Sequence, residues 1–409
     1  MIDFQKKIYN SNKFRQAALT FIRTGKYCPY PTNTAEFLRY WDEEMDRCIH
    51  GYTAEDGDFI SGYNYFYLNY CPMQRIVNEV TKLPNGETKV KRRSEVTFPD
   101  FYDYDYYYFQ SVQQCEDEGK HLCVMKSRRK GYSYKGGAMA VRNYYLIPNS
   151  KTYVYASNKQ YLTDDGILTK AWDYMDFIDK HTAWGKKRSV NTAMRKRAGF
   201  ISKDEYGNEI EMGYKSEIIG VTLKDNPDVV RGKRAKLILF EEGGSFSELG
   251  AAWQIARPSV EQDGIAFGTM IVWGTGGDEG SAFETMKDMF YHPEGYNCLG
   301  FDNIWDENAA TSKCGFFCPQ YTNQDVLDEN GKRIYMDEDG NTFTKKSIEY
   351  ILNERKKVIN TATNSAAIDR YVAERPITPA EAMLEFNGNI FPKKELLEQL
   401  SKIRTNKQL

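Results

Sequence analysis

The sequence predicts an α/β fold with a mostly parallel central sheet flanked by helices, and three short apolar segments are the reason. Residues 121–125, 237–240 and 269–273 are largely apolar runs of the length expected for buried strands. A basic loop follows the first segment, a pair of glutamates the second, and a glycine-rich turn the third. This order predicts a nucleotide-hydrolysing core, and the long stretch between the first two segments fits a sheet with inserted crossovers.

Residues 1–95 precede this core and predict an N-terminal extension that packs on it. Helix-compatible segments cover 11–24 and 34–49, and a dense aromatic run covers 62–70. That run fits a packed edge of the nucleotide domain, with a stacking platform for nucleic-acid bases as the alternative. The extension ends in a turn-rich basic loop, with a turn at 83–86 followed by cations at 89–93.

A variant phosphate-binding loop follows the first strand of the core. Residues 126–133 read Lys-Ser-Arg-Arg-Lys-Gly-Tyr-Ser, and the standard loop G-x-x-x-x-G-K-[ST] closes a strand and opens a helix. Gly131 and Ser133 hold the second glycine and the hydroxyl positions, but Tyr132 stands where lysine is usual. Residues 136–145 follow with helix-compatible spacing, and the N-terminus of a helix favours phosphate.

Cations upstream of the tyrosine could replace the missing lysine, because a side chain entering from the start of the loop can reach the same phosphates. Arg128 and Lys126 are the first candidates and Lys130 is the third. Taken by itself, the loop also fits a basic turn without a ligand. The candidate ATP-binding residues of the loop are Lys126, Ser127, Arg128, Arg129, Lys130, Gly131, Tyr132 and Ser133.

The segment between the loop and the acid pair predicts a second strand at 151–156 and a hairpin over 201–222 around a turn at 206–208. Between them lies a concentration of positive charge, called here the 186–197 patch. It could hold nucleic-acid phosphates without reading bases, with a solvated charged loop as the alternative. The whole chain has a net charge of −2, so such contact must come from local patches. The cations of the patch are Lys186, Lys187, Arg188, Arg195, Lys196 and Arg197.

The second strand-like segment ends in Glu241 and Glu242. In P-loop ATPases such a strand carries one carboxylate toward Mg²⁺ and a second that polarises water. We expect Glu241, in place of the common aspartate, to hold Mg²⁺ together with Ser133, and Glu242 to orient the water. An acidic strand end without a ligand is the alternative. The third segment ends in Gly274-Thr275-Gly276, whose small polar residue can sense the γ-phosphate.

The remaining segments and the composition bear on the C-terminal subdomain, metal binding, disulfides and membrane contact. Residues 281–392 predict a lid and linker subdomain, with a helix at 345–359. Cys314 and Cys318 lack the spacing of a zinc site and fit core packing. The 8 cysteines form no obvious disulfide framework, which suits a reducing compartment. No apolar stretch approaches the 18 residues of a transmembrane helix, so we expect no membrane contact.

Six signatures in order resemble the large terminase subunit of tailed bacteriophages, the motor that pumps DNA into the capsid. The resemblance spans roughly residues 98–392. The departures from the family pattern are Tyr132 and Glu241. The signatures are Phe109-Gln110, Ser127-Arg128, the Arg231-Gly232 pair, Glu241-Glu242, Gly274-Thr275-Gly276, and Pro376–Ala382 followed by Ile390-Phe391-Pro392.

The resemblance implies an ASCE/RecA-like P-loop NTPase core over 96–280, with ATP and Mg²⁺ as cofactors. Gln110 would read the adenine edge, Arg231 would be an arginine finger supplied to a neighbouring subunit, and 274–276 would couple hydrolysis to movement. The implied partners are double-stranded DNA, the portal protein of the procapsid, the small terminase subunit, and further copies of the chain in a pentameric ring. The implied location is the host cytoplasm, without retention in the mature virion.

A full large terminase subunit also carries a C-terminal nuclease, whose first strand would follow residue 391. We expect no nuclease activity here, and we interpret 393–409 as a tail leading to an absent nuclease domain. Two other functions remain open. One is a different P-loop motor on nucleic acid, such as a helicase. The other is a non-catalytic DNA-binding or assembly protein with an inactive loop, which Tyr132 alone favours.

Overall fold

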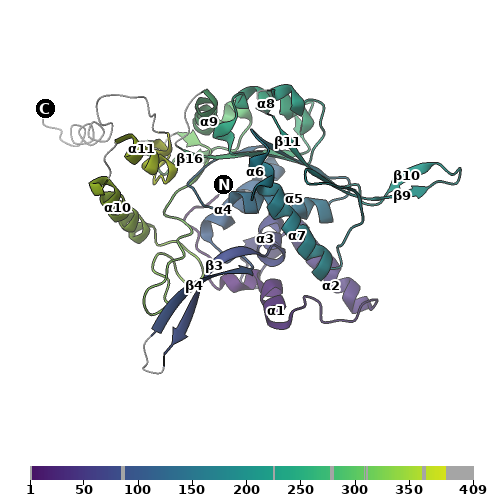
Figure 1. Ribbon diagram of the computed structural model, residues 1–409, viewed down its shortest axis with the longest axis horizontal. Coiled ribbons are helices and arrows are strands. Elements are labelled where there is room, and N and C mark those ends of the chain that lie inside the picture. Colours follow the sequence, from purple (N-terminus) through teal and green to yellow (C-terminus); the bar gives the residue numbers. More distant parts are fainter. Residues whose placement is uncertain are drawn as a thin grey trace.

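The central feature is an eight-stranded sheet in the order β18-β5-β15-β12-β6-β11-β8-β7 (Figure 1). The structure is a computed structural model that describes residues 2–83, 88–223, 226–276, 281–307, 309, 312–361 and 365–383. Neighbouring strands from β18 to β11 pair in parallel, and β8 and β7 add an antiparallel edge. The predicted mixed α/β class is therefore confirmed. The strands are β5 (Leu122–Lys126), β6 (Lys151–Ala156), β7 (Arg188–Asn191), β8 (Arg195–Ala198), β11 (Glu217–Thr222), β12 (Leu237–Glu241), β15 (Thr269–Thr275) and β18 (Phe316–Cys318).

The parallel strands are apolar throughout because helices cover both faces of the sheet. Alternate residues of one strand enter different cores: Val124 joins the core under α5, and Cys123 joins the core under α8 and α9. Figure 1 shows α8 and α9 on one side of the sheet and α5, α7 and α3 on the other. These helices are α3 (Gly62–Tyr70), α5 (Tyr132–Leu146), α7 (Ile167–His181), α8 (Leu249–Ala256) and α9 (Ser281–Tyr291). A further helix, α4 (Asp103–Glu118), precedes β5.

The N-terminal extension packs on the α5 side of the sheet. The predicted helices are present as η1 (Ser11–Phe14) with α1 (Gln16–Thr24), and as α2 (Ala35–His50). Every residue of the aromatic run in α3 is buried. Its rings therefore form a packed layer, and the alternative of an exposed base-stacking platform is wrong for this run.

Two β-hairpins extend from the body (Figure 1). β9 (Phe200–Lys203) and β10 (Glu209–Met212) confirm the predicted turn near 206–208, but the following 217–222 segment is the central strand β11 instead of a hairpin arm. The second hairpin pairs β3 (Met73–Lys82) with β4 (Thr88–Thr97). The expectation of a basic loop at 89–93 is therefore wrong, because these residues form β4.

The C-terminal region combines one sheet strand with a helical unit. β18 lies within the segment predicted as lid, yet it pairs with β5 at the sheet edge. The predicted helix is confirmed as α10 (Thr344–Thr361), followed by α11 (Ser365–Glu374) and α12 (Pro379–Ala382). Arg355 of α10 donates to both carboxylate oxygens of Glu381 in α12, at 2.7 and 2.8 Å. Residues 390–392 and the tail at 393–409 lie outside the described residues.

The remaining elements are short connections. They are β1 (Tyr52–Thr53), β2 (Phe59–Ile60), α6 (Gln160–Thr163), η2 (Pro227–Val230), η3 (Gly243–Ser245), η4 (Arg257–Ser259), β13 (Glu261–Gln262), β14 (Ile265–Ala266), η5 (Pro293–Tyr296), β16 (Phe301–Asp302) and β17 (Lys313–Cys314).

Among the described residues, no helix is long and apolar enough to cross a bilayer.

Candidate functional site

The predicted strand–loop–helix unit is present where the variant loop was expected. β5 ends at Lys126, and α5 begins at Tyr132. Gly131 caps the helix with φ of 71°, a left-handed conformation that glycine adopts without strain. Arg129 also has a positive φ, of 61°. The chain therefore turns sharply between strand and helix and leads into the N-terminus of α5, where unpaired N–H groups favour an anion.

The predicted metal ligands Ser133 and Glu241 meet at this helix N-terminus. The Ser133 hydroxyl donates to Oε1 of Glu241 at 2.6 Å, from the first turn of α5 to the end of β12. The Glu241 side chain is buried. Burial, and then the charge of Glu242, raise the pKa of Glu241 to about 7. A carboxyl group with this pKa exchanges its proton easily near neutral pH.

Lys126 lies beside the second acid of the pair. Its Nζ is 2.8 Å from Oε1 of Glu242, and the Lys126 side chain is only 7% exposed. Lys126 ends β5 and Glu242 follows β12, with β15 between the two strands. Of the cations considered for the missing lysine, Lys126 is the one that the structure brings to the acid pair.

Arg128 and Lys130 point to other partners. Arg128 is 54% exposed, and its guanidinium is 2.7 Å from Oε1 of Glu374 in α11. Lys130 is buried and donates to the carbonyls of Gln320 and Thr322 at 2.9 and 2.6 Å. Burial lowers the pKa of Lys130 to about 8. Both residues therefore connect the loop to the C-terminal region.

Tyr132 is a core residue, which explains why a tyrosine can occupy this position. Its ring lies 4.9 Å from the ring of Tyr108 and 4.3 Å from Nζ of Lys135. Lys135 is buried and pairs with Asp105 of α4 at 2.8 Å. Tyr132 therefore anchors the start of α5 in the core, and sequence reasoning missed the Lys135–Asp105 pair below it.

The loop is also bonded to the segment between β18 and α12. Ser127 donates to the side-chain carbonyl of Gln320, and the Arg128 N–H donates to the Glu374 carbonyl at 3.1 Å. Gly276 of the predicted coupling motif touches the same segment. A Cβ at Gly276 would lie 2.4 Å from the Ala382 carbonyl oxygen, so only glycine fits. No sequence pattern signalled Gln320 or Glu374.

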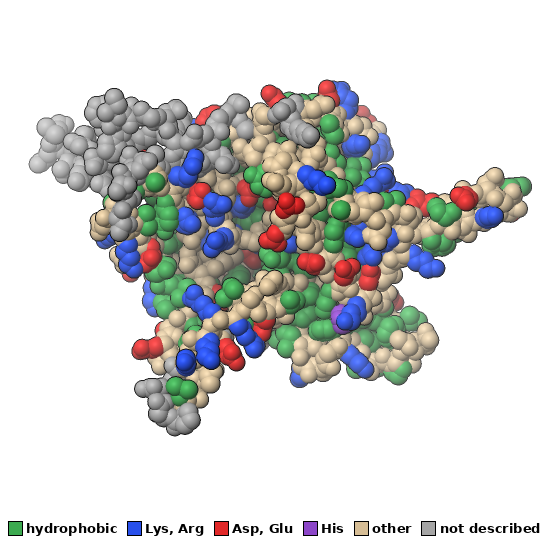
Figure 2. Space-filling view, viewed as in Figure 1, with side chains coloured by type: hydrophobic (Ala, Val, Ile, Leu, Met, Phe, Trp, Pro, Cys, Tyr) green, Lys and Arg blue, Asp and Glu red, His purple; other side chains and the backbone are tan. Residues whose placement is uncertain are grey.

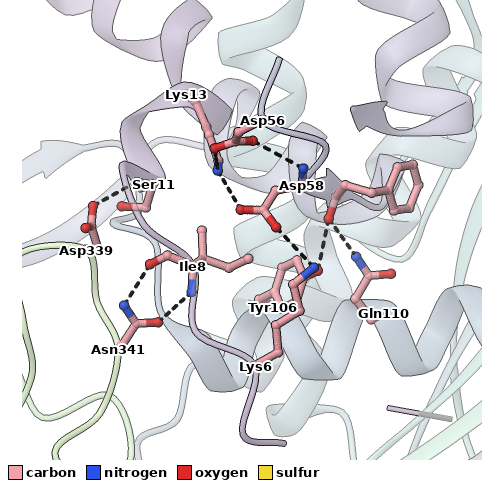
Figure 3. A network of polar contacts seen from close by, with 11 residues as sticks. Lys6, Ile8, Ser11, Lys13, Asp56, Asp58, Tyr106, Gln110, Asp339 and Asn341 are labelled. Carbon is pink, nitrogen blue, oxygen red and sulfur yellow. Dashed lines mark hydrogen bonds and ion pairs between the residues drawn. The ribbon is translucent and has the colours of Figure 1, made fainter. Parts of the chain in front are cut away.

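Gln110 and Arg231 lie away from the acid pair. The Gln110 amide donates to the Phe59 carbonyl at 3.3 Å, next to the polar network around Lys6 (Figure 3). Arg231 is 71% exposed and pairs with Asp228 at 2.7 Å. The structure brings neither side chain to the loop of its own chain, so adenine recognition and the role of a finger for a neighbour stay predictions.

The cations of the 186–197 patch already contact other side chains of the protein. Arg188 pairs with Asp179, Arg195 with Glu217, and Arg197 with both Glu211 and Glu217. The lysines lie against aromatic rings, with Nζ of Lys186 3.9 Å from the Tyr214 ring centre. Burial lowers the pKa of Lys186. The three arginines therefore brace the β7–β8 edge of the sheet, and a grip on DNA here stays a prediction.

The residues at the acid pair fit Mg²⁺. This ion prefers oxygen ligands and one or two carboxylates. Ser133 and Glu241 supply a hydroxyl and a carboxylate where β12 ends and α5 begins. The second oxygen of Glu241, Oε2, is buried without a hydrogen-bond partner among the described residues. A buried oxygen of this kind needs a partner, which a bound cation would provide.

Comparisons with known proteins give distant structural likenesses only. No protein-family model matches the sequence, and no curated protein matches it. The Thermus phage P74-26 large terminase ATPase domain is similar at 12% identity and a TM-score of 0.39, over 62% of this chain and 87% of that one. The large terminase of a thermophilic bacteriophage in complex with ADP gives 12% identity and a TM-score of 0.31, over 44% and 40%. The HK97 bacteriophage large terminase gives 8% identity and a TM-score of 0.34, over 65% and 50%.

Proposed function

We propose that this chain hydrolyses ATP with Mg²⁺ and is the motor part of a phage terminase large subunit, which translocates double-stranded DNA into the procapsid. The observation that carries the ATPase is the meeting of the loop with the acid pair, through Ser133–Glu241 and Lys126–Glu242. The six ordered sequence signatures support the DNA motor. They include the Pro376–Ala382 segment, which packs against Gly276 at the end of β15.

Each residue has a distinct part in this proposal. The N–H groups at the start of α5 would bind phosphate oxygens, and Ser133 and Glu241 would hold Mg²⁺, whose charge would offset that of the phosphates. Glu242 orients the attacking water and accepts its proton. Because Lys126 pairs with Glu242, its ammonium must turn toward the phosphates before Glu242 can act on water.

The position of Tyr132 favours an active loop over an inactive one. Tyr132 fills the core, and Lys126 brings a cation to the acids from the other end of the loop. Phosphoryl transfer depends on positioned charge, so a cation that enters from β5 can do the work of the usual lysine.

The assembled state belongs to the same proposal. Exposed Arg231 would act on ATP held by the neighbouring copy in a pentameric ring. The ring would sit on the portal protein of the procapsid in the host cytoplasm, and the small terminase subunit would take part in packaging. DNA would be held through its phosphates, because a packaging motor must advance on any sequence.

ATP turnover of the purified chain, with and without Mg²⁺, tests the proposal. The matched control is Glu242→Gln, which keeps the shape of the site and removes the base. Turnover that needs Mg²⁺ and disappears in the control is expected. An equal rate in both proteins would refute the site. A strand-displacement assay on a forked duplex separates the alternatives, because unwinding coupled to ATP would identify a helicase.

A further inference from the structure

We infer that the β3–β4 hairpin is a second contact for the phosphate backbone of double-stranded DNA, separate from the 186–197 patch. The hairpin extends from the body, and Figure 2 shows lysine and arginine side chains along it. This inference rests on the proposed function and adds a named DNA-binding element to it. It concerns the described residues 73–82 and 88–97.

The hairpin carries an excess of exposed positive charge. Lys82 ends β3, and its side chain is exposed. In β4, Lys89, Lys91, Arg92 and Arg93 are all exposed. The acidic side chains of the described hairpin are fewer, Glu79 and Glu95.

The cations nearest the hairpin tip have no carboxylate partner. Arg93 pairs with Glu95 at 2.7 Å, but no ion pair is found for Lys89, Lys91 or Arg92 among the described residues. Every arginine of the 186–197 patch, in contrast, pairs with a carboxylate. A cation already paired in the protein loses that partner when it binds a phosphate, whereas an unpaired cation exchanges only water and counterions. The unpaired cations of the hairpin are therefore better prepared for phosphates than the paired arginines of the patch.

The spacing of these cations suits a nucleic-acid backbone. Lys89, Lys91 and Arg93 alternate along β4 and lie on one face of the hairpin, opposite Thr81, Glu79 and Val77. Alternate residues of a strand are about 6.6 Å apart. Phosphates of one DNA strand recur every 3.4 Å or so along the helix axis, so alternate cations match roughly every second phosphate.

The root of the hairpin is fixed to the body. Arg75 donates to Asp100 at 2.9 Å and to the Phe98 carbonyl at 2.8 Å. Asp100 also pairs with Arg15 at 2.9 Å and with Arg333 at 3.3 Å. The neighbouring arginines hold the pKa of Asp100 below its usual value, although burial acts in the opposite direction. Asp100 therefore joins the root of the hairpin to Arg15, at the start of α1, and to Arg333 of the C-terminal region.

Protection of an exposed strand edge is the simpler explanation for charge on a hairpin. Sequence-independent binding of a polyanion requires the bias toward lysine and arginine in β4. Lysine is also typical of a protected edge, so duplex binding and its salt dependence are what separate the two explanations.

Binding to a short labelled DNA duplex, in two unrelated sequences, tests the inference across about 50 to 200 mM salt. The variant combines Lys89→Gln, Lys91→Gln and Arg93→Gln, the three cations that share one face of the hairpin. The matched control removes the same charge from α10 through Lys345→Gln, Lys346→Gln and Lys356→Gln, at positions that are also exposed. Thermal unfolding and ATP turnover without DNA are measured on every protein.

The hairpin variant is expected to bind both duplexes about tenfold more weakly at low salt, and the slope of log K against log salt should fall by about 0.9 for each lost phosphate contact. The control should behave as the wild type does. The inference is overturned if the hairpin variant matches the control, if the loss is confined to one sequence, or if the wild type does not bind duplex DNA. If only ATP turnover is absent from the wild type, the proposed ATPase fails while the DNA contact stands.

Discussion

Lys126 and Glu242 form an ion pair with a separation of 2.8 Å between Nζ and Oε1, although 116 residues separate them in the sequence. The pair joins the end of β5 to the residue after β12. It places a cation of the variant loop beside the acid that we propose orients water. If ATP binds at this loop, as we propose, the Lys126–Glu242 ion pair should break when the ammonium turns toward the phosphates.

Lys126→Met should lower ATP turnover about 10²–10³-fold, as the loss of a group that stabilises transition-state charge does. Arg128→Ala should have a smaller effect, because its guanidinium binds Glu374 at the surface. Steady-state ATPase rates and nucleotide affinity of both variants check this. A greater loss in Arg128→Ala would show that Arg128 is the displaced cation.

Glu242→Gln should keep ATP binding and lose about 10²–10⁴ in turnover, because the amide accepts no proton. Calorimetry with ATP and a rate measurement separate the two quantities. Glu241→Gln is the companion variant, and it should weaken Mg²⁺ binding instead. Normal hydrolysis by Glu242→Gln would mean that another group orients the water.

Mg²⁺ affinity should rise with pH up to about 7 and then level off. The pKa of Glu241 is raised to about 7, and the metal requires the ionised carboxylate. Below that pH, each unit should cost about tenfold in affinity, as expected for release of one proton. Without metal, the contribution of this group to the free energy of unfolding should fall as the pH rises toward 7, because the folded state alone retains the proton. Titration of Mg²⁺ beside a non-hydrolysable ATP analogue, from below to above this pKa, measures the slope. A flat profile would contradict the assignment.

Tyr132→Lys should destabilise the protein by about 3 kcal/mol or more, although it restores the usual loop sequence. The new ammonium would enter the core next to Lys135, whose Nζ is 4.3 Å from the Tyr132 ring centre. Tyr132→Phe is the matched control. The Tyr132 hydroxyl has no hydrogen-bond partner among the described residues, so its removal should cost less than about 1 kcal/mol. Denaturant unfolding of both variants measures the difference, and a stable Tyr132→Lys protein would show that the side chain can leave the core.

A mixture of Arg231→Ala chains and Glu242→Gln chains should recover ATP turnover that neither variant has alone. An arginine finger contributes roughly 10³–10⁵ to kcat where it has been measured. In a mixed ring, Glu242→Gln donates a sound arginine to a neighbour whose water-orienting acid is intact. Rates are measured against protein concentration at several mixing ratios. No recovery, under conditions where the wild type assembles, would place Arg231 within its own subunit.

The sequence predicted the elements that are buried on both faces, because their apolar runs are continuous and short. β5, β12 and β15 were located in this way, with the loop and acids at their ends. The β3–β4 hairpin was missed because its strands carry many charges and bury little. Contacts such as Arg128–Glu374 and Ser127–Gln320 join residues 246 and 193 positions apart, and no local pattern encodes them. The sequence also did not predict the ion pairs of the patch arginines, because their partner Glu217 lies in β11, the strand next to β8 in the sheet.

The bonds from Arg128 to Glu374 and the close approach of Gly276 to Ala382 have a thermodynamic consequence. If nucleotide changes the free energy of these contacts, then restraint of α11 or α12 must change nucleotide affinity by the same factor. A restraint on α11 or α12 would then raise or lower the affinity of the loop for ATP. Under that condition, a partner that binds α11 or α12 would regulate the loop without touching it.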